Sequence, residues 1–293
     1  MIIIGENLHI ISAEVSKAIK ERDVKFVQDL AVAQAEAGAH YIDLNIGPAR
    51  KNPEEMVPWL VKTVEAVVST PLSIDTLNPV AMEAGLRACT KARPLINSAS
   101  GRTDSKQLML PLAKKYNANL VLSVFTDKGC PPDVEGRIES IMETVAYANE
   151  LGIPNEDLWI DPVLLPISAD QGQVVRALEF IKIVGDVLPG VKSTIGLSNV
   201  SNGTPEHLRG ILNRAEMIML GRCGQYSVIA DALDKDLIGL NRGDMPGIVD
   251  LIYRVMDGED VDLASLSPQE RDYVKTTKVL LGQTLYSHSW LED

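Results

Sequence analysis

The sequence predicts an α/β fold: a (β/α)8 barrel, or TIM barrel, with an appended C-terminal helical segment. Short apolar runs that are typical of buried parallel strands alternate with amphipathic helical segments along the chain. Several of these runs end in one or two short polar residues, as strands do where they open into the shared mouth of a barrel. The length of 293 residues, 45% of them hydrophobic, suits one barrel domain with a large core.

The first half of the chain contains the first four predicted strands. They cover residues 2–4, 41–45, 72–75 and 95–97. Predicted helices follow these strands, and they cover residues 23–37, 53–68, 79–88 and 105–116. Turn signals separate the two kinds of element, because Gly38 stops the first helix and Gly47-Pro48 closes the second strand.

The second half continues the alternation. Further strands are predicted at residues 119–125, 158–161 and 193–197, with helices at residues 134–151 and 173–188. The eighth strand has two candidates. Residues 215–220 are apolar enough to form it, but they fit equally well at the end of a helix that begins near Pro205. In that case the strand is residues 227–230 with Asp231 at its tip, and we favour this second interpretation.

The C-terminal part departs from the alternating pattern. After Asp234 the chain passes Gly243, Pro246 and Gly258 before a final helix that is predicted at residues 267–286. The stretch from roughly residue 240 to 277 is therefore interpreted as an appended helical insertion in a single domain of residues 1–293.

Charge and composition argue against several classes of partner. The net charge is −12, from 28 basic and 40 acidic residues, whereas nucleic acid or an anionic membrane surface would require a basic face. The three cysteines and four histidines are scattered without paired spacing, so we expect neither a metal site nor a disulfide framework. No run is long enough to span a membrane, and the opening residues lack the features of a signal peptide, so a cytoplasmic location is expected.

The polar tips of the predicted strands form the candidate site. Asp75, Asn97 and Asp161 each end a strand, and Asn199 follows the seventh. Carboxylates and amides without a cluster of cations or metal ligands suit a neutral, flat, donor-rich ligand better than a phosphate. A single Asp in such a place is more often a helix cap or a turn residue, but several tips in one barrel favour a site. Asp43 and Asn45 fit either role.

Seven short motifs occur in order along the chain. They are Gly5-Glu6, Asp43-Leu44-Asn45-Ile46-Gly47-Pro48-Ala49, Ile74-Asp75-Thr76, Ile96-Asn97-Ser98, Trp159-Ile160-Asp161-Pro162, Gly196-Leu197-Ser198-Asn199-Val200-Ser201 and Ile229-Ala230-Asp231-Ala232. In this order and spacing, the chain resembles the pterin-binding methyltransferases that move a methyl group between methyltetrahydrofolate and a corrinoid protein. The resemblance covers nearly all of the chain to Leu237 and resumes at residues 280–286.

The resemblance implies roles for particular residues. The pterin ligands of the family fall on Asp75, Asn97 and Asp161, and Asn199 matches the loop Asn that bonds the methyl-bearing pterin nitrogen. Asn199 and Asp75 are the implied catalytic residues. The remaining residues implied at the pterin site are Gly196, Ser198, Asn202 and Arg209. The chain departs from the family at Asn7, where Arg is common, at Asn202, where Gln is common, and by two extra residues before Arg209.

The function implied is methyl transfer between methyltetrahydrofolate and the cobalt of a corrinoid (cobalamin). A partner corrinoid protein would bring in the corrinoid, and the enzyme would be a homodimer. Transfer in either direction fits the sequence. One alternative is a pterin enzyme similar to dihydropteroate synthase, but that enzyme would carry a phosphate site with a Lys, whereas Pro162-Val163-Leu164-Leu165-Pro166 follows Asp161 here. Another alternative is a folate-binding module without catalysis.

Overall fold

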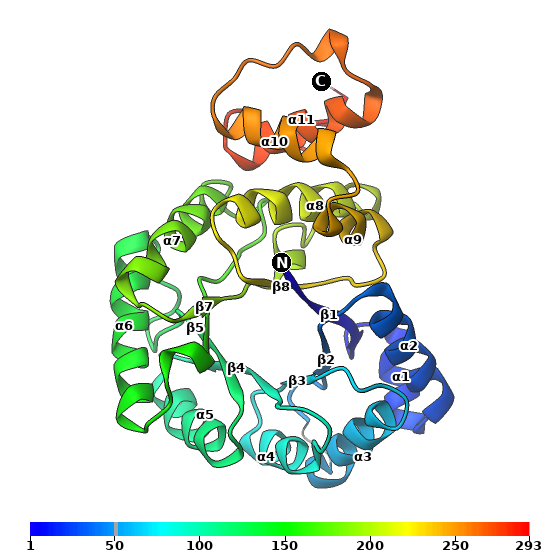
Figure 1. The fold of residues 1–293 in the computed structure, drawn as a ribbon, viewed down its shortest axis with the longest axis vertical. Helices are drawn as coiled ribbons and strands as arrows, with labels where there is room; N and C mark the ends of the chain where they lie inside the picture. Colours follow the sequence, from blue (N-terminus) through cyan, green and yellow to red (C-terminus); the bar gives the residue numbers. More distant parts are fainter. Residues whose placement is uncertain (50–51, 293) are drawn as a thin grey trace.

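The computed structural model describes residues 1–49 and 52–292, and eight parallel strands form a barrel within them (Figure 1). The strands are β1 Ile2–His9, β2 Tyr41–Asn45, β3 Leu72–Asp75, β4 Leu95–Ser100, β5 Asn119–Ser123, β6 Leu158–Asp161, β7 Lys192–Ser193 and β8 Ser227–Ala230. Their order in the sheet is β7-β6-β5-β4-β3-β2-β1-β8. A parallel bridge between Gly196 and Ile229 closes the barrel between its two ends. The predicted barrel is confirmed.

Helices surround the strands as a ring, which Figure 1 shows from the end of the barrel. The helices of the ring are α1 Ala13–Glu21, α2 Val24–Ala37, α3 Pro53–Glu65, α4 Pro79–Ala88, α5 Thr103–Tyr116, α6 Val134–Glu150, α7 Gln173–Val187 and α8 Glu206–Arg222. Helix α1 was missing from the prediction. Ser12 caps this helix by accepting a hydrogen bond from the Val15 N–H. The other boundaries lie within a few residues of those expected.

The two interpretations of the eighth strand are now resolved. Residues 227–230 form β8 and Asp231 follows directly, as we favoured, whereas residues 215–220 lie inside helix α8.

The seventh strand is shorter than predicted. Of residues 193–197, only Ser193 belongs to β7, and Leu197–Asn199 form a 3₁₀ turn, labelled η2. Residues 194–196 still bond to neighbouring strands, because the Thr194 N–H donates to the Ile160 carbonyl and the Ile195 carbonyl accepts from the Ile229 N–H. The ladder ends at η2, where the Asn199 N–H donates to the Gly196 carbonyl and the Val200 N–H to the Leu197 carbonyl. Asn199 therefore lies in a tight turn at the barrel mouth.

An apolar layer fills the barrel below its mouth. The buried side chains of Ile4, Leu95, Val121 and Trp159 touch one another although they come from four different strands, so they point into the barrel. The Trp159 ring meets the Tyr41 and Tyr226 rings edge to face, with centroids 5.5 and 5.2 Å apart. Side chains that alternate with these along a strand face the helices instead. The filled interior therefore places any ligand cavity at one end of the barrel.

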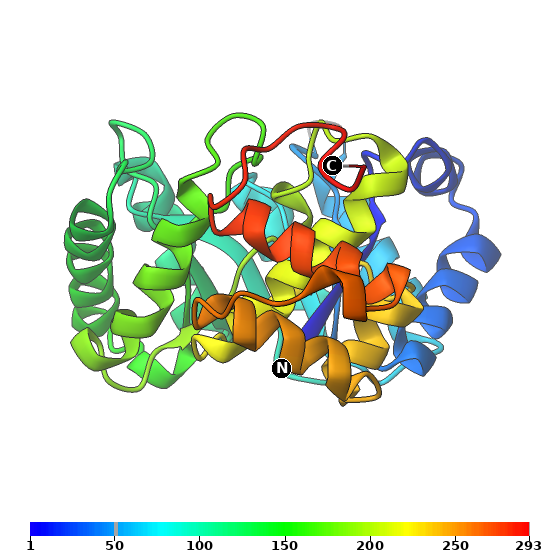
Figure 2. The ribbon, with the colours of Figure 1, turned by 90° about the horizontal axis from the view of Figure 1, so that it is seen from above.

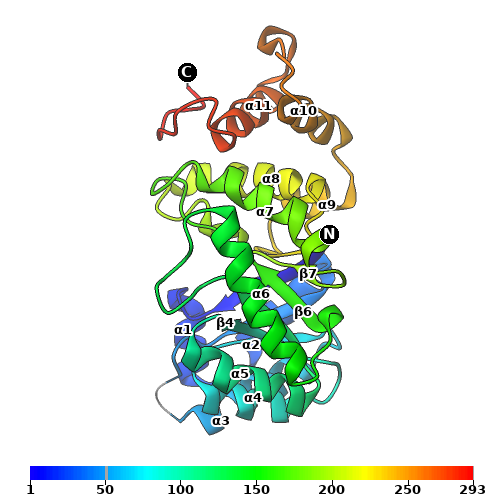
Figure 3. The same ribbon diagram turned by 90° about the vertical axis from the view of Figure 1, so that its left-hand side faces the viewer.

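The C-terminal segment forms a helical layer outside the ring. It contains α9 Lys235–Arg242, α10 Pro246–Met256 and α11 Pro268–Leu280, and Figures 1 and 3 show α10 and α11 stacked outside α8. Leu251, Val255, Val261 and Val274 give this layer its own small apolar cluster. The final helix ends at Leu280 rather than at residue 286, because Gly282 turns the chain with a φ of 72°. The interpretation of residues 1–293 as one domain stays a prediction.

The last residues of the chain return to the mouth end of the barrel (Figure 2). The Gln171 side chain, in the loop between β6 and α7, donates to the carbonyls of Val279 and Thr284, each at 2.7 Å. The hydroxyl groups of Tyr286 and Thr204 are 2.7 Å apart. These bonds connect the C-terminal layer to the loops that follow β6 and β7.

Helix α8 contains a buried carboxyl group, Glu216, that makes no hydrogen bond within the described residues. Burial raises its pKa well above the usual value. Below the pKa of the unfolded chain the group is neutral in both states. As the pH rises above that value the unfolded state ionises first, so Glu216 makes the fold progressively less stable.

We therefore expect Glu216→Gln to unfold at the same urea concentration as the wild type near pH 4 and to be more stable at pH 8. The gain at pH 8 should be about 1–3 kcal/mol, because a neutral amide avoids the cost of holding or neutralising a buried carboxylate. Urea unfolding at several pH values measures it. Parallel curves of unfolding free energy against pH for the two proteins would contradict this expectation.

Candidate active site

A cavity of about 1010 Å³ opens at the carboxyl ends of the strands. Its lining is mostly polar and comes from the strand ends, from the loops that follow β7 and β8, and from the first turns of helices α8 and α9. All eight residues predicted for the site line it, and these are Asp75, Asn97, Asp161, Gly196, Ser198, Asn199, Asn202 and Arg209. The structure also brings Asp43 and Asn45 into the same wall, and it adds lining residues that were not expected, among them Glu6, Asn7, His9 and Asp231.

Strands β2, β3 and β4 form one wall of the cavity. Asn45, Asp75 and Asn97 lie side by side in register across these strands. The Asn45 amide donates a hydrogen bond to Asp75. One layer deeper, Asp43 Oδ1 accepts from the Ser73 hydroxyl at 2.6 Å and from the Asn97 amide at 3.1 Å. The wall thus presents carboxyl oxygens held in place by neighbouring donors.

Burial makes these carboxyl groups unusually basic. It raises the pKa of Asp43 to about 6, although the hydrogen bonds from Ser73 and Asn97 oppose the change. Burial and then the nearby Asp43 raise the pKa of Asp75 well above its usual value, and the bond from Asn45 lowers it only in part. A ligand that donates hydrogen bonds to these oxygens would favour their ionised form.

Asp161 ends β6 on the opposite wall. Its Oδ1 accepts a hydrogen bond of 2.7 Å from the backbone N–H of Val163. Val163 reaches this position with a φ of 65°, in the left-handed region that a β-branched residue seldom adopts. Burial raises the pKa of Asp161 to about 6, while the Val163 N–H and the charge of Arg137 lower it. The local backbone therefore holds this carboxyl group in one orientation.

Two β-bulges aim further side chains into the mouth. Between Gly5 and Leu8, strand β1 has one residue more than β2, so Glu6 and Asn7 occupy the bulge. Strand β4 has the same irregularity between Ile96 and Ala99, which includes Asn97 and Ser98. All four bulged residues line the cavity. A bulge re-aims side chains that a regular strand would send to opposite faces, and this explains why neighbours in sequence share the site.

Glu6 is the functional candidate that our sequence reasoning missed. The Ser198 hydroxyl donates to Glu6 Oε2 at 3.1 Å, although the two residues are far apart in sequence. Burial raises the pKa of Glu6 to about 7, with further increases from Asp231 and Asp43, while the Ser198 bond and Arg209 lower it. We ended the first strand at Ile4, where the apolar run stops. The alternation of Ile2, Ile4 and Glu6 on the inner face was the available signal.

The η2 turn holds Asn199 over a glycine. Asn199 is exposed at the mouth, and its side chain lies so close to Gly196 that a Cβ atom there would be 2.9 Å from the Asn199 Nδ2 atom. The lack of a side chain at Gly196 thus permits the position that Asn199 adopts.

For the methyl transfer that the resemblance implies, Gly196→Ala should therefore displace the Asn199 amide and lower kcat roughly tenfold or more, because small misplacements of a working group are costly. Folate affinity should change little, since the carboxyl wall is untouched. Steady-state kinetics measure the effect. Gly185→Ala is the matched control, because a Cβ atom at Gly185 meets nothing within 4 Å, and it should behave as the wild type. Normal kcat in Gly196→Ala would mean that the position of Asn199 is unimportant.

Arg209 lies in the first turns of α8 at the rim of the cavity. Its Nε donates to the Ser201 hydroxyl at 3.3 Å, and its Nη1 is 3.6 Å from Glu206 Oε2. Asn202 is exposed, and its N–H donates to the Asn199 carbonyl at 3.1 Å. The two extra residues before Arg209 have thus not removed it from the site.

Comparison with known proteins shows the family to which the chain belongs. The model of the family described as pterin binding enzyme matches residues 12–219. The chain belongs to this family. A curated relative, the methylcorrinoid:tetrahydrofolate methyltransferase of Eubacterium limosum, is 33% identical over 241 residues, which are 82% of this chain and 88% of the relative.

Solved structures of dihydropteroate synthases share the fold of this pterin-binding enzyme. The enzyme of Xanthomonas albilineans with 4-aminobenzoic acid superimposes with a TM-score of 0.63 and 19% identity, over 83% of this chain and 92% of that one. The enzyme of Stenotrophomonas maltophilia has a TM-score of 0.59 and 18% identity, over 75% of this chain and 88% of that one. At these identities the likeness shows the fold alone.

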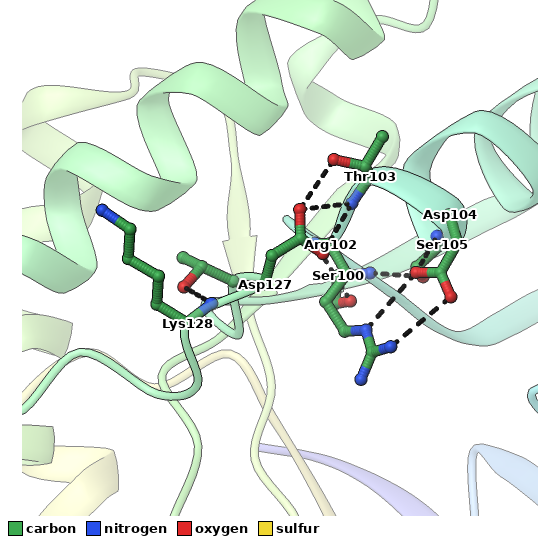
Figure 4. A network of polar contacts seen from close by, with 8 residues as sticks. Ser100, Arg102, Thr103, Asp104, Ser105, Asp127 and Lys128 are labelled. Atoms are coloured by element: carbon green, nitrogen blue, oxygen red, sulfur yellow. Dashed lines mark hydrogen bonds and ion pairs between the residues drawn. The ribbon is translucent and has the colours of Figure 1, made fainter.

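Beyond the cavity, a polar network joins the loops that follow β4 and β5 (Figure 4). Asp127 accepts from the Thr103 hydroxyl at 2.7 Å and from the Thr103 N–H at 3.3 Å. The Ser105 hydroxyl accepts from the Ser100 N–H at 3.0 Å, directly after the bulge of β4. These residues do not line the cavity, and they act by connecting neighbouring loops of the rim.

Two kinds of feature do not occur in the part of the chain that the structure describes. Residues 1–49 and 52–292 contain no group of three or more His, Cys, Asp or Glu side chains arranged to hold a metal ion. Within the same ranges, every helix is too short or too polar to cross a lipid bilayer.

Proposed function

We propose that this pterin-binding enzyme transfers a methyl group from a methylcorrinoid to tetrahydrofolate. The observation that supports this most is the gathering of Asp75, Asn97, Asp161 and Asn199 in one cavity at the barrel mouth. The name of the relative from Eubacterium limosum supports the two substrates and the direction of transfer. The corrinoid enters as a substrate, and a partner corrinoid protein would carry it.

The acceptor-rich wall suits the edge of a pterin. The pterin ring presents an amino group and ring N–H groups, which are donors, and the cavity offers the carboxyl oxygens of Asp75 and Asp161 together with the amide of Asn97. Burial raises the pKa of both carboxyl groups, and pterin donors would stabilise their charged forms. Asp75, Asn97 and Asp161 thus bind and orient the pterin in this proposal, with Gly196, Ser198, Asn202 and Arg209 around it.

The transfer itself requires a free electron pair on the pterin nitrogen N5. This pair forms the new bond to the methyl carbon, and the bond from that carbon to cobalt breaks with its electron pair left on cobalt. N5 gains positive charge during the step and then loses its proton. In this proposal the Asn199 amide oxygen accepts a hydrogen bond from the N5 proton as this charge develops.

The rim of the mouth is open enough for a large methyl donor. Asn199 and Asn202 are exposed, and two apolar side chains at the rim, Ile11 and Leu77, are 86% and 76% exposed. Exposed apolar side chains around a polar cavity are a common feature of surfaces that bind another protein. We propose that the partner corrinoid protein docks on this rim and that the enzyme is a homodimer.

Dihydropteroate synthesis is the alternative within the same fold. That reaction releases pyrophosphate and needs cations that can bind it. The two arginines of the cavity are already paired with carboxylates in this structure. Arg214 lies 2.9 Å from Asp234 and 2.8 Å from Asp236, and Arg209 lies near Glu206. Lys235 also lines the cavity, exposed at the start of α9 and without an ion pair among the described residues, so the pairing withholds the two arginines, and not this lysine, from a phosphate group.

The proposal is tested by mixing the protein with methylcobalamin and tetrahydrofolate and following the absorbance of the corrinoid, with methyltetrahydrofolate as the measured product. Formation of this product supports methyl transfer. Binding of tetrahydrofolate without product, even with a corrinoid protein as methyl donor, would indicate a folate-binding module instead. Formation of dihydropteroate from a pterin pyrophosphate and 4-aminobenzoic acid would indicate the alternative enzyme.

A further inference from the structure

We propose that Glu6 receives the proton that N5 of tetrahydrofolate loses during methyl transfer, and that the Ser198 hydroxyl relays it. The inference rests on the proposed function and gives a role to a residue that the pterin site leaves unassigned. It follows from the placement of Glu6 in the mouth and from the chemistry of its hydrogen-bond partner.

Glu6 lies in the cavity next to the turn that contains Asn199. Glu6 faces the cavity from the inner face of β1, and the residue that donates to it, Ser198, is the direct neighbour of Asn199 in the η2 turn. If Asn199 faces N5, then the Ser198 hydroxyl is in the same turn and lines the same cavity. Glu6 is thus connected to the reacting end of the pterin through one hydroxyl group.

The hydrogen-bond donor to each carboxyl group distinguishes Glu6 from the other carboxyl groups of the cavity. Asp75 accepts from the Asn45 amide and Asp161 from the backbone N–H of Val163, and neither amide group can pass a proton on at neutral pH. Asp43 does accept from a hydroxyl group, but its donor, Ser73, is fully buried and is not part of the cavity lining. Ser198 can accept one proton while it donates another. The other carboxylates of the lining bond to amides or arginines: Asp231 to Asn7, Asp234 and Asp236 to Arg214, and Glu206 to Arg209. Among the described residues, Glu6 is therefore the cavity carboxylate whose partner is a hydroxyl group that also lines the cavity.

The proposed step balances in atoms and charge. The N5 electron pair bonds to the methyl carbon, the cobalt to carbon bond leaves its pair on cobalt, and methylated N5 carries one positive charge. The single N5 proton, to which Asn199 Oδ1 bonds while the charge develops, then moves to Ser198 Oγ as the hydroxyl proton moves to Glu6 Oε2. The products are methyltetrahydrofolate, reduced corrinoid, and a neutral Glu6 that later releases its proton to water.

A proton acceptor must be ionised before the step, so the rate should rise with pH. The charged groups that face Glu6 are Asp43 from β2, Asp231 after β8 and Arg209 from α8, and His9 on β1 interacts with the latter two. Burial raises the pKa of Glu6 to about 7, and the two carboxylates raise it further while Arg209 opposes them. For transfer to tetrahydrofolate, kcat/KM should rise through a midpoint near pH 7, which is the value for the ligand-free enzyme, and kcat should rise in the same direction. For the reverse direction it should fall over the same range, because the neutral acid is then required.

The test uses the full-length protein with free methylcobalamin and tetrahydrofolate, and it measures kcat, KM and their pH dependence. Glu6→Gln should lower kcat by about 10²-fold and remove its rise with pH, in the range usual for loss of a general base. The KM for tetrahydrofolate should change less than about threefold. Glu6→Asp keeps an acid and should recover part of the rate and of the pH dependence. Ser198→Ala should resemble Glu6→Gln.

Glu216→Gln is the matched control, because it makes the same change at a buried carboxyl group that does not line the cavity. It should keep the wild-type rate and profile. A Glu6→Gln enzyme with wild-type kcat and pH profile would overturn the proton role. So would a variant that raises KM without lowering kcat, since Glu6 would then be a pterin ligand. If the wild type itself transfers no methyl group, the proposed function fails first, and the two failures are thereby distinguished.

Discussion

Asn199→Ala is expected to lower kcat/KM for methyl transfer by on the order of 10²-fold or more, comparable to the loss of one donor of an oxyanion hole. The amide is proposed to interact mainly when N5 carries positive charge, so its loss should weaken the transition state more than the bound ground state. Folate affinity should therefore fall much less. Steady-state kinetics with methylcobalamin, together with direct titration of tetrahydrofolate, measure both quantities.

The competing explanation is that Asn199 only caps the following loop. Removal of a cap would cost about 1 kcal/mol of stability with near-normal turnover. In the structure, the Asn199 side chain makes no hydrogen bond with the residues described, which does not favour a cap. A thermal melt measured together with the kinetics distinguishes a loop cap from a catalytic role. A destabilised variant with wild-type turnover would refute the catalytic role.

Asp161→Asn is expected to weaken tetrahydrofolate binding by about 1–3 kcal/mol at pH 7.5, because the amide replaces one acceptor oxygen with a donor that faces the pterin donors. The fold should survive this nearly isosteric change. Asp75→Asn should have an effect of similar size for the same reason. Titration calorimetry measures the affinities. Asp250→Asn, an exposed residue on α10, is the matched control and should bind folate as the wild type does.

The same variant should also alter the pH dependence of binding. Burial raises the pKa of Asp161 to about 6, and a donating ligand binds its ionised form. Below pH 6 the wild type must release a proton to bind, so its affinity should decrease as the pH falls from 7 to 5. The affinity of Asp161→Asn should decrease less over the same pH range. Equal slopes in the two proteins, or equal affinities at pH 7.5, would remove Asp161 from the pterin site.

The sequence by itself determined the architecture and the cavity wall. Both depend on local patterns: apolar runs of strand length, helical periodicity between them, and polar residues where the runs end. Parallel strands in a barrel must bring their carboxyl ends to one mouth, so Asp75, Asn97 and Asp161 had to meet once the strands were placed. The residues of the η2 turn could also be predicted as part of the site, because their motif lies in the loop after the seventh strand.

Only the tertiary structure decided which further side chains enter the mouth. The bulges of β1 and β4 arise from the hydrogen-bond register between neighbouring strands, and no local pattern in the sequence reports that register. They bring Asn7 and Ser98 to the mouth beside Glu6 and Asn97, which strand alternation alone directs inward. The raised pKa values likewise depend on burial by residues distant in sequence. The sequence thus determines where the strands end, whereas contacts between strands determine which side chains face the ligand and how they ionise.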